Sequence, residues 1–91
     1  MVANNEINQD LKVVSGALSD VEMLDLPWNE FEIASLSIEW PDICGRARNL
    51  IENESRLINE QWERFHDLKN RFKIVNEKLK ELNLENPFEQ E

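Results

Sequence analysis

Glycine and proline are scarce in this sequence, which has two glycines and three prolines among its 91 residues. Antiparallel sheets depend on turns rich in glycine, and neither Asn-Gly nor Asp-Gly occurs anywhere in the chain. A sheet fold therefore has no support in the sequence. We predict an all-α fold, built almost wholly of helices.

Residues that build catalytic and metal sites are also rare. Cys44 is the only cysteine and His66 the only histidine, and neither has other ligand-type residues at a recognisable metal-binding spacing. The common nucleotide-binding, metalloprotease and hydrolase motifs are missing as well. We therefore predict a protein that is not an enzyme, with no catalytic residues, no cofactor and no metal. Because one cysteine cannot close an internal disulfide, a reducing, intracellular compartment is expected.

Long apolar runs are missing too. No stretch approaches the roughly 20 apolar residues that a helix needs to span a bilayer. The first residues, MVANNEINQD, are polar and acidic, unlike a signal or transit peptide. We expect a soluble cytoplasmic protein, with the nucleus as an alternative location, and no membrane insertion.

Positive charge is almost absent from the first half of the chain. Residues 1–42 hold nine acids and one base, Lys12, for a net charge of −8, whereas residues 43–91 hold ten acids and nine bases, for a net charge of −1. A phosphate backbone would meet a repulsive field, so direct binding to nucleic acid is not expected. A basic protein partner suits this charge distribution, and so does solubility alone.

The hydrophobic pattern predicts three helices in a single domain of residues 1–85. The first helix, about residues 5–25, repeats apolar residues at spacings of three and four, and Pro27 ends it. The second, about residues 28–38, is short. Its apolar residues also alternate as in a strand, but no partner strand is available to pair with it. The third helix, about residues 42–84, starts after the next proline.

The third predicted helix has coiled-coil character, because its apolar residues keep alternating spacings of three and four, interrupted only at Glu54 and Gln61. At about 1.5 Å per residue it would be roughly 60 Å long, twice the length of the first helix. Two short helices packed on it cannot cover all of it. We therefore expect its C-terminal part to bind another chain, in a homodimer or a helical hetero-complex. The predicted partner-binding seam consists of Phe65, Leu68, Phe72, Val75, Leu79 and Leu82.

A different arrangement is compatible with the same pattern. The long helix could break near Asn70 or Asn76, and the chain would then close into a monomeric bundle that buries the seam itself. An exposed apolar patch of this size is rare on soluble monomers, so one of the two arrangements must cover it.

The acidic segment of residues 20–42 supports a second functional hypothesis, since it interleaves acids with large apolar side chains and contains no base. Acids guide the encounter with a basic surface, and aromatic anchors supply most of the affinity. Such a segment suits an inhibitor or nucleic-acid mimic that binds a basic protein. The alternative is that Trp28, Phe31 and Trp40 belong to the core. The predicted acidic surface consists of Asp20, Glu22, Asp25, Glu30, Glu32, Glu39 and Asp42.

Residues 86–91 are predicted to form a flexible acidic tail. Within it, Asn86-Pro87-Phe88-Glu89 resembles the NPF motif recognised by EH domains of endocytic adaptors. The resemblance implies that the Asn-Pro turn presents Phe88 to a pocket of such a domain. The alternative is that these residues stop the helix and leave a loose aromatic cap. All these hypotheses describe a protein–protein interaction module, as an adaptor or an inhibitor, whose partner is another copy or a foreign protein.

Overall fold

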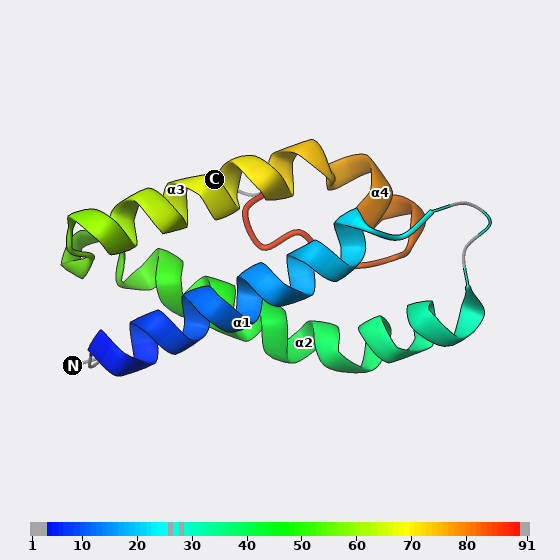
Figure 1. Cartoon of the computed structure of the whole chain (residues 1–91), viewed down its shortest axis with the longest axis horizontal. Coiled ribbons are helices and arrows are strands. Elements are labelled where there is room, and N and C mark those ends of the chain that lie inside the picture. The colour runs from blue at the N-terminus through cyan, green and yellow to red at the C-terminus, as the bar shows by residue number, and fades with distance from the viewer. Residues whose placement is uncertain (1–3, 26, 28, 90–91) are drawn as a thin grey trace.

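The computed structural model describes residues 4–25, 27 and 29–89. The described chain is helical and contains no strand, so the prediction of an all-α fold is confirmed. Its elements are α1 (Asn4–Glu22), α2 (Glu30–Glu52), the 3-10 helix η1 (Glu54–Arg56), α3 (Asn59–Ile74) and α4 (Asn76–Glu81). Figure 1 shows α1, α2 and α3 running in alternating directions along the long axis, with α4 at one end. The molecule measures 41 × 21 × 20 Å.

The second helix is much longer than the sequence predicted. α2 continues through Pro41, where a break between helices at 28–38 and 42–84 was expected. Its start is fixed by Asn29, whose Oδ1 accepts hydrogen bonds from the backbone N–H groups of Phe31 (2.9 Å) and Glu32 (3.3 Å).

Pro41 is tolerated inside α2 because the turns on both sides of it are anchored in the core. A proline within a helix removes one hydrogen bond and costs about 3 kcal/mol or more. Trp40 before it and Ile43 after it are only 3% and 4% exposed. Their burial offsets the cost of the proline and keeps the helix continuous. Pro41 itself lies on the outer, exposed side.

The long helix expected over residues 42–84 does not form. The α-helical path is interrupted between Glu52 and Asn59, and α3 ends at Ile74, with Val75 between it and the start of α4 at Asn76. The second of these breaks lies next to Asn76, one of the two places that the alternative arrangement named, but the chain reverses its direction at the first break. The predicted packing of two short helices on one long C-terminal helix is therefore not found.

Polar side chains stabilise the reversal between α2 and α3. Asn53 Nδ2 donates to the backbone oxygen of Asn49 at 2.8 Å, and Gln61 Oε1 accepts from the backbone N–H of Ile58 at 3.2 Å. Gln61 is one of the two residues that interrupt the apolar pattern of the sequence, and Glu54, the other, starts η1. The two polar interruptions thus mark the place where the chain turns back on itself.

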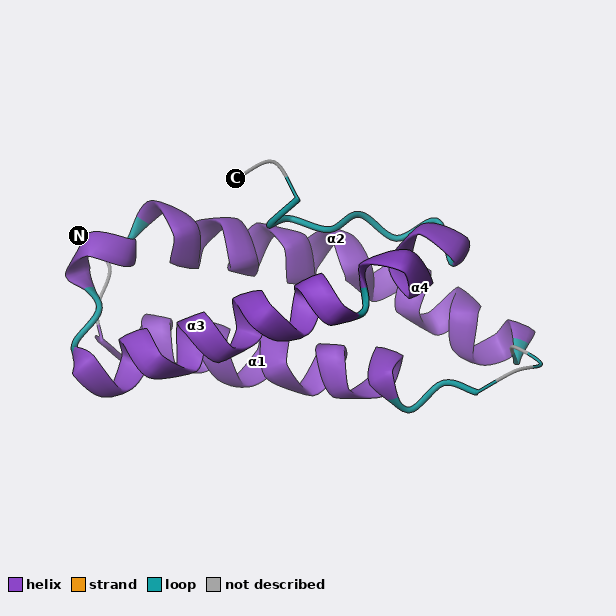
Figure 2. Ribbon diagram, turned by 90° about the horizontal axis from the view of Figure 1, so that it is seen from above, coloured by secondary structure: helices purple, strands orange, loops and turns teal. Residues whose placement is uncertain are grey.

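The core lies between the three main helices and extends to the chain after α4. Asn83 has a φ of 58°, a left-handed conformation that asparagine tolerates, and it turns the chain back toward α2 and α3. Phe88 then packs with its ring centroid 5.7 Å from that of Phe65 and 5.0 Å from that of Phe72. Figure 2 shows this returning segment lying along the bundle.

The expected flexibility of residues 86–91 is not what the structure shows for residues 86–89. Asn86 and Phe88 are 8% and 7% exposed. Asn86 Nδ2 donates to the backbone oxygen of Phe72 at 3.3 Å and to Asn76 Oδ1 at 2.9 Å. An aromatic side chain gains more from burial against two other rings than from solvation, which explains the difference. Residues 90–91 lie outside the described residues.

Candidate functional site

The predicted partner-binding seam is part of the core of this chain. Its six residues are each at most 8% exposed, and Phe65, Phe72 and Leu79 are fully buried. The reversal between α2 and α3 places α1 against α3 and so covers the seam from within. The prediction that the seam binds another chain is therefore wrong, because the seam offers no surface. The reason is the interruption of the helix between Glu52 and Asn59, where the sequence analysis expected a continuous helix. The residues of the seam are Phe65, Leu68, Phe72, Val75, Leu79 and Leu82.

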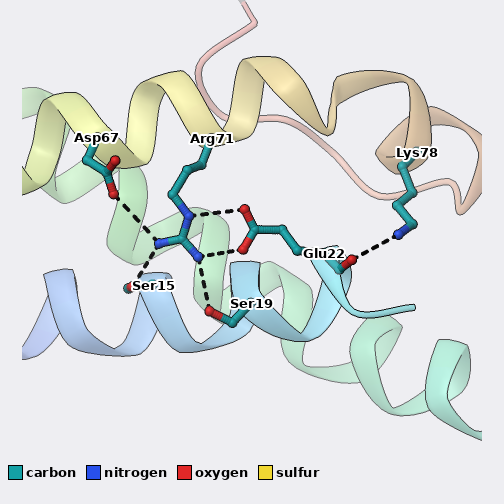
Figure 3. A network of polar contacts seen from close by, with 6 residues as sticks. All are labelled: Ser15, Ser19, Glu22, Asp67, Arg71 and Lys78. Atoms are coloured by element: carbon teal, nitrogen blue, oxygen red, sulfur yellow. Dashed lines mark hydrogen bonds and ion pairs between the residues drawn. The ribbon is translucent and has the colours of Figure 1, made fainter. Parts of the chain in front are cut away.

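An ion pair ties the buried seam of α3 to α1. Figure 3 shows the Arg71 guanidinium facing α1, where Nε donates to Glu22 Oε2 at 3.1 Å and Nη2 to Glu22 Oε1 at 2.7 Å. The Arg71 side chain is 20% exposed and that of Glu22 34% exposed. Hydrogen bonding from Arg71 lowers the pKa of the Glu22 carboxyl, and the charge of Arg71 adds to this against the opposing effect of burial.

Two hydroxyl groups and one more carboxylate complete the same network. Arg71 donates through Nη1 to Ser15 Oγ and through Nη2 to Ser19 Oγ, both at 3.0 Å, and Asp67 Oδ2 lies 3.9 Å from Nη1. Every polar arm of Arg71 is thereby engaged within the chain. Glu22, one of the seven predicted acidic surface residues, is accordingly a structural group that holds two helices together.

The remaining six acids of the predicted surface point away from the core. Asp42 accepts a hydrogen bond from Arg46 Nε at 3.0 Å, within the same helix. The others are exposed, and within the described residues none of them has an ion-pair partner. These unpaired carboxylates belong to Asp20, Asp25, Glu30, Glu32 and Glu39.

The N-terminal half of α2 is barely packed on the rest of the molecule. Figures 1 and 2 show that it projects beyond the ends of α1 and α4. Between residues 29 and 39 only Leu36 is buried, and Ile33 is half-buried. The Phe31 and Ile38 side chains are 79% and 81% exposed. Two large apolar side chains therefore stand in solvent among unpaired acids.

A groove of about 430 Å³ lies between the end of α1 and this half of α2. Met23, which is 79% exposed, and Phe31 supply apolar surface at its edges. Its lining includes three carboxylates and no base: Asp20, Glu32 and Glu39. We call the groove together with the exposed half of α2 the acidic face. It consists of Asp20, Met23, Asp25, Glu30, Phe31, Glu32, Ile38, Glu39 and Asp42.

The three aromatic residues of the acidic segment have different environments. Trp40 belongs to the core, as the alternative interpretation had it, and its Nε1 donates to the backbone oxygen of Glu85 at 2.6 Å. Phe31 lies outside the core, as the binding hypothesis required. Trp28 falls outside the described residues.

One feature that the sequence analysis missed lies further along the same side of α2. Asp10 on α1 is 6% exposed and accepts hydrogen bonds from Arg46 Nη1 at 3.1 Å and Asn49 Nδ2 at 2.7 Å. Asp10 immediately precedes Leu11, a member of the apolar stripe of the first helix. A carboxylate at the edge of such a stripe was the feature of the sequence from which this contact could have been predicted. The contacts of Asp10 with Arg46 and Asn49 hold α1 against α2.

Cys44 and His66, the two residues considered for chemical reactivity, both pack against other parts of the chain. Cys44 is 1% exposed, and burial, followed by the nearby charge of Glu85, raises the pKa of its thiol to about 11. His66 stacks on Trp62, with ring centroids 4.6 Å apart. Among the described residues, no three metal-ligand side chains are grouped closely enough to hold an ion.

The NPF-like motif is folded into the molecule. Asn86 Oδ1 accepts a hydrogen bond from the backbone N–H of Phe88 at 2.9 Å, which forms the Asn-Pro turn that the resemblance implied. The turn directs Phe88 into the core, where it is 7% exposed. In this conformation the ring is not available to a pocket of another protein.

Comparison of the chain with protein-family models, curated proteins and solved structures found no match. No helix in the described part of the chain combines the length and the apolar character that crossing a membrane requires.

Proposed function

We propose that this protein is a non-enzymatic protein–protein interaction module that binds a basic protein through its acidic face. The observation that supports the proposal is the exposure of Phe31 and Ile38, at 79% and 81%, among carboxylates that have no ion-pair partner in the described chain. The interface proposed here is not the predicted seam from Phe65 to Leu82, because the side chains of that seam are buried in the core.

The proposal follows from what each group gains on contact. Burial of the Phe31 side chain in a partner would contribute roughly 1.5–3 kcal/mol to the free energy of binding, and burial of Ile38 about the same. Single apolar residues are common on protein surfaces, but here Met23 lies on the same groove as Phe31, so a partner could cover both at once. The surrounding carboxylates raise the association rate with a positively charged surface and repel an acidic one.

The charge selects the class of partner. The formal net charge of −9 opposes pairing of the acidic face with a second copy or with nucleic acid. If the basic surface of the partner is itself a nucleic-acid-binding site, the module competes with nucleic acid for it and acts as an inhibitor. If the basic surface serves another purpose, the module acts as an adaptor. The same contact is required in both cases.

Two double variants with equal changes of charge test the proposal. Glu30→Lys with Glu32→Lys reverses charge on the acidic face, at the start of α2. Glu60→Lys with Glu63→Lys makes the same reversal near the start of α3, where both residues are exposed. Proteins captured from the native cell by the unaltered chain should include a basic protein that the α3 variant retains and the α2 variant loses.

Binding of the captured protein is then repeated with purified components at two salt concentrations. The affinity is expected to fall as salt rises, since exposed charges are screened over about 10 Å at 0.1 M. Equal retention by both double variants would refute the proposed surface. Loss of binding by both would assign the effect to net charge alone, and it would also count against the acidic face.

A further inference from the structure

We infer that the element of the partner that docks on the acidic face is an amphipathic helix lying along α2. This inference rests on the proposed function. It starts from a second apolar stripe on α2, separate from the stripe that faces the core. All members of this outer stripe are exposed: Phe31, Ala34, Ile38, Pro41 and Gly45.

The outer stripe lies opposite the core stripe of the same helix. At about 100° per residue, its five members fall within about 80° of one another around the helix axis. The buried residues of α2 cluster roughly half a turn away on the same projection. They are Leu36, Trp40, Ile43, Cys44, Ala47 and Leu50. One face of α2 thus serves the fold, and the other is exposed, although Pro41 and Gly45 also line a hollow that the α2 helix shares with α1.

The spacing of the outer stripe is that of a helix-packing seam. Its members follow one another at intervals of three, four, three and four residues, from Phe31 to Gly45. This is the repeat at which one helix packs its side chains into the spaces of a neighbouring helix at a shallow angle. The stripe is about 21 Å long at 1.5 Å per residue, which matches a partner helix of about four turns.

The sizes of the stripe residues also suit a helix. Phe31 and Ile38 project as knobs, and Ala34 and Gly45 are small enough to let another backbone approach closely. A Cβ added at Gly45 would meet no atom within 4 Å, so this end of the stripe is open. Pro41 lacks an N–H group and presents an apolar ring, so it adds no unsatisfied donor to such an interface.

Charge determines which helix the stripe accepts. Residues 30–45 contain four acids and no base. Glu30 and Asp42 occupy the positions that flank a packing seam, where charged side chains select the partner, and of the two Asp42 is already paired with Arg46 of the same helix. Glu32 and Glu39 lie further out. A second copy of α2 would bring like charges together. The matching partner therefore carries aliphatic residues along one stripe and lysine or arginine beside it.

A synthetic peptide serves as the probe. It contains about three heptads, with leucine at positions a and d and lysine at e and g. One control peptide has glutamate in place of lysine, and a second keeps the lysines and leucines but has proline at two central positions, which prevents a helix. Binding to the full chain is measured by isothermal titration calorimetry. The lysine peptide should bind, and both controls should bind at least about tenfold more weakly.

Two variants locate the peptide on the stripe. Ile38→Asp should weaken binding about tenfold or more, since it removes an anchor and adds a negative charge to the seam. Gly45→Trp should do the same by blocking the open end. Gly16→Trp is the matched control, because Gly16 is exposed on α1 with no atom within 4 Å of an added Cβ. It should change the affinity less than about twofold.

The outcomes separate this inference from the proposed function. If the proline peptide binds as tightly as the helical one, or if Gly45→Trp and Gly16→Trp have equal effects, the helical partner is refuted. The proposed function survives that result when the protein captured from cells is still lost with Glu30→Lys and Glu32→Lys. If neither the lysine peptide nor any basic protein binds, both proposals fail. Far-UV circular dichroism of each variant verifies that the bundle is intact.

Discussion

Replacing Arg71 by methionine should destabilise the bundle measurably without changing its architecture. Methionine keeps much of the aliphatic stem and removes the guanidinium, which donates to Glu22, Ser15 and Ser19. A hydrogen bond to a charged group contributes about 1.5–3 kcal/mol when buried, whereas an exposed ion pair contributes about 0–1 kcal/mol. Arg71 and Glu22 are 20% and 34% exposed, which places them between these cases. We expect a loss of about 2 kcal/mol.

Urea unfolding followed by circular dichroism measures this loss. The midpoint should fall with an unchanged m-value, and a loss of about 2 kcal/mol corresponds to a fall in Tm of about 8–16 °C for a domain of this size. Arg64→Met is the control, because Arg64 is an exposed arginine on the same helix. It should change the free energy of unfolding by less than about 0.5 kcal/mol. Equal effects of the two variants would refute the role of the network.

The ion pair of Arg71 and Glu22 should make the free energy of unfolding depend on pH. The pKa of Glu22 is lowered from its ordinary value of 4.5, chiefly by hydrogen bonding from Arg71. A carboxyl whose folded pKa is depressed contributes stability that is fully present above the unfolded pKa and is lost as pH falls through the folded value. The difference in stability between the unaltered chain and Arg71→Met should therefore be constant from neutral pH to about pH 5 and shrink below pH 4.5. A difference that stays constant at still lower pH would contradict the ion pair.

Two further predictions concern the corrected core. Phe72→Ala should cost about 3–5 kcal/mol, because Phe72 is fully buried, whereas Ile74→Ala should change the free energy of unfolding by less than about 0.5 kcal/mol. Equal small effects in urea unfolding would contradict the burial of the seam. Phe88→Ala should speed the reaction of Cys44 with an aromatic disulfide reagent at about pH 8, since the segment that holds Glu85 over the thiol is loosened. An unchanged rate would mean that this segment does not protect Cys44.

The sequence predicted those parts of the fold in which local pattern and packing agree. The first helix begins within one residue of its expected start, because its apolar residues and its polar beginning indicate the same element. Pro41 misled the prediction, since a proline usually marks a helix start, and only burial of Trp40 and Ile43 keeps this one inside a helix. That burial depends on contacts with other elements, and such contacts cannot be derived from the spacing of apolar residues along the sequence.

The largest error, the prediction of one continuous helix over residues 42–84, came from giving too little weight to two polar residues. Glu54 and Gln61 were treated as tolerated exceptions in a continuous helix, although they mark the corner between α2 and α3. Gln61 is 2% exposed and donates through Nε2 to Asn8 Oδ1 at 3.1 Å, a contact across 53 residues of sequence. Once the corner is known, the seam has partners within the chain. The inferred need for another chain was a consequence of the missing corner.

The candidate site was predictable in its charge and only partly in its shape. The excess of acids over residues 20–42 is visible in the sequence, but the Glu22 carboxylate is paired with Arg71, which lies 49 residues away. Trp40, which is buried, and Phe31, which is exposed, lie on opposite sides of one continuous helix. The break expected at Pro41 hid this relation, because it ended the predicted second helix before Trp40.

The footprint of the bound basic protein on this chain tests the proposed interface most directly. Amide hydrogen exchange of the full chain is measured with and without the purified partner, at a concentration that saturates binding. Slower exchange is expected over residues 29–42, with the C-terminal turns of α1 also affected, and little change is expected in α3 and α4. Protection confined to α3 and α4, with none at the start of α2, would contradict the acidic face as the binding surface.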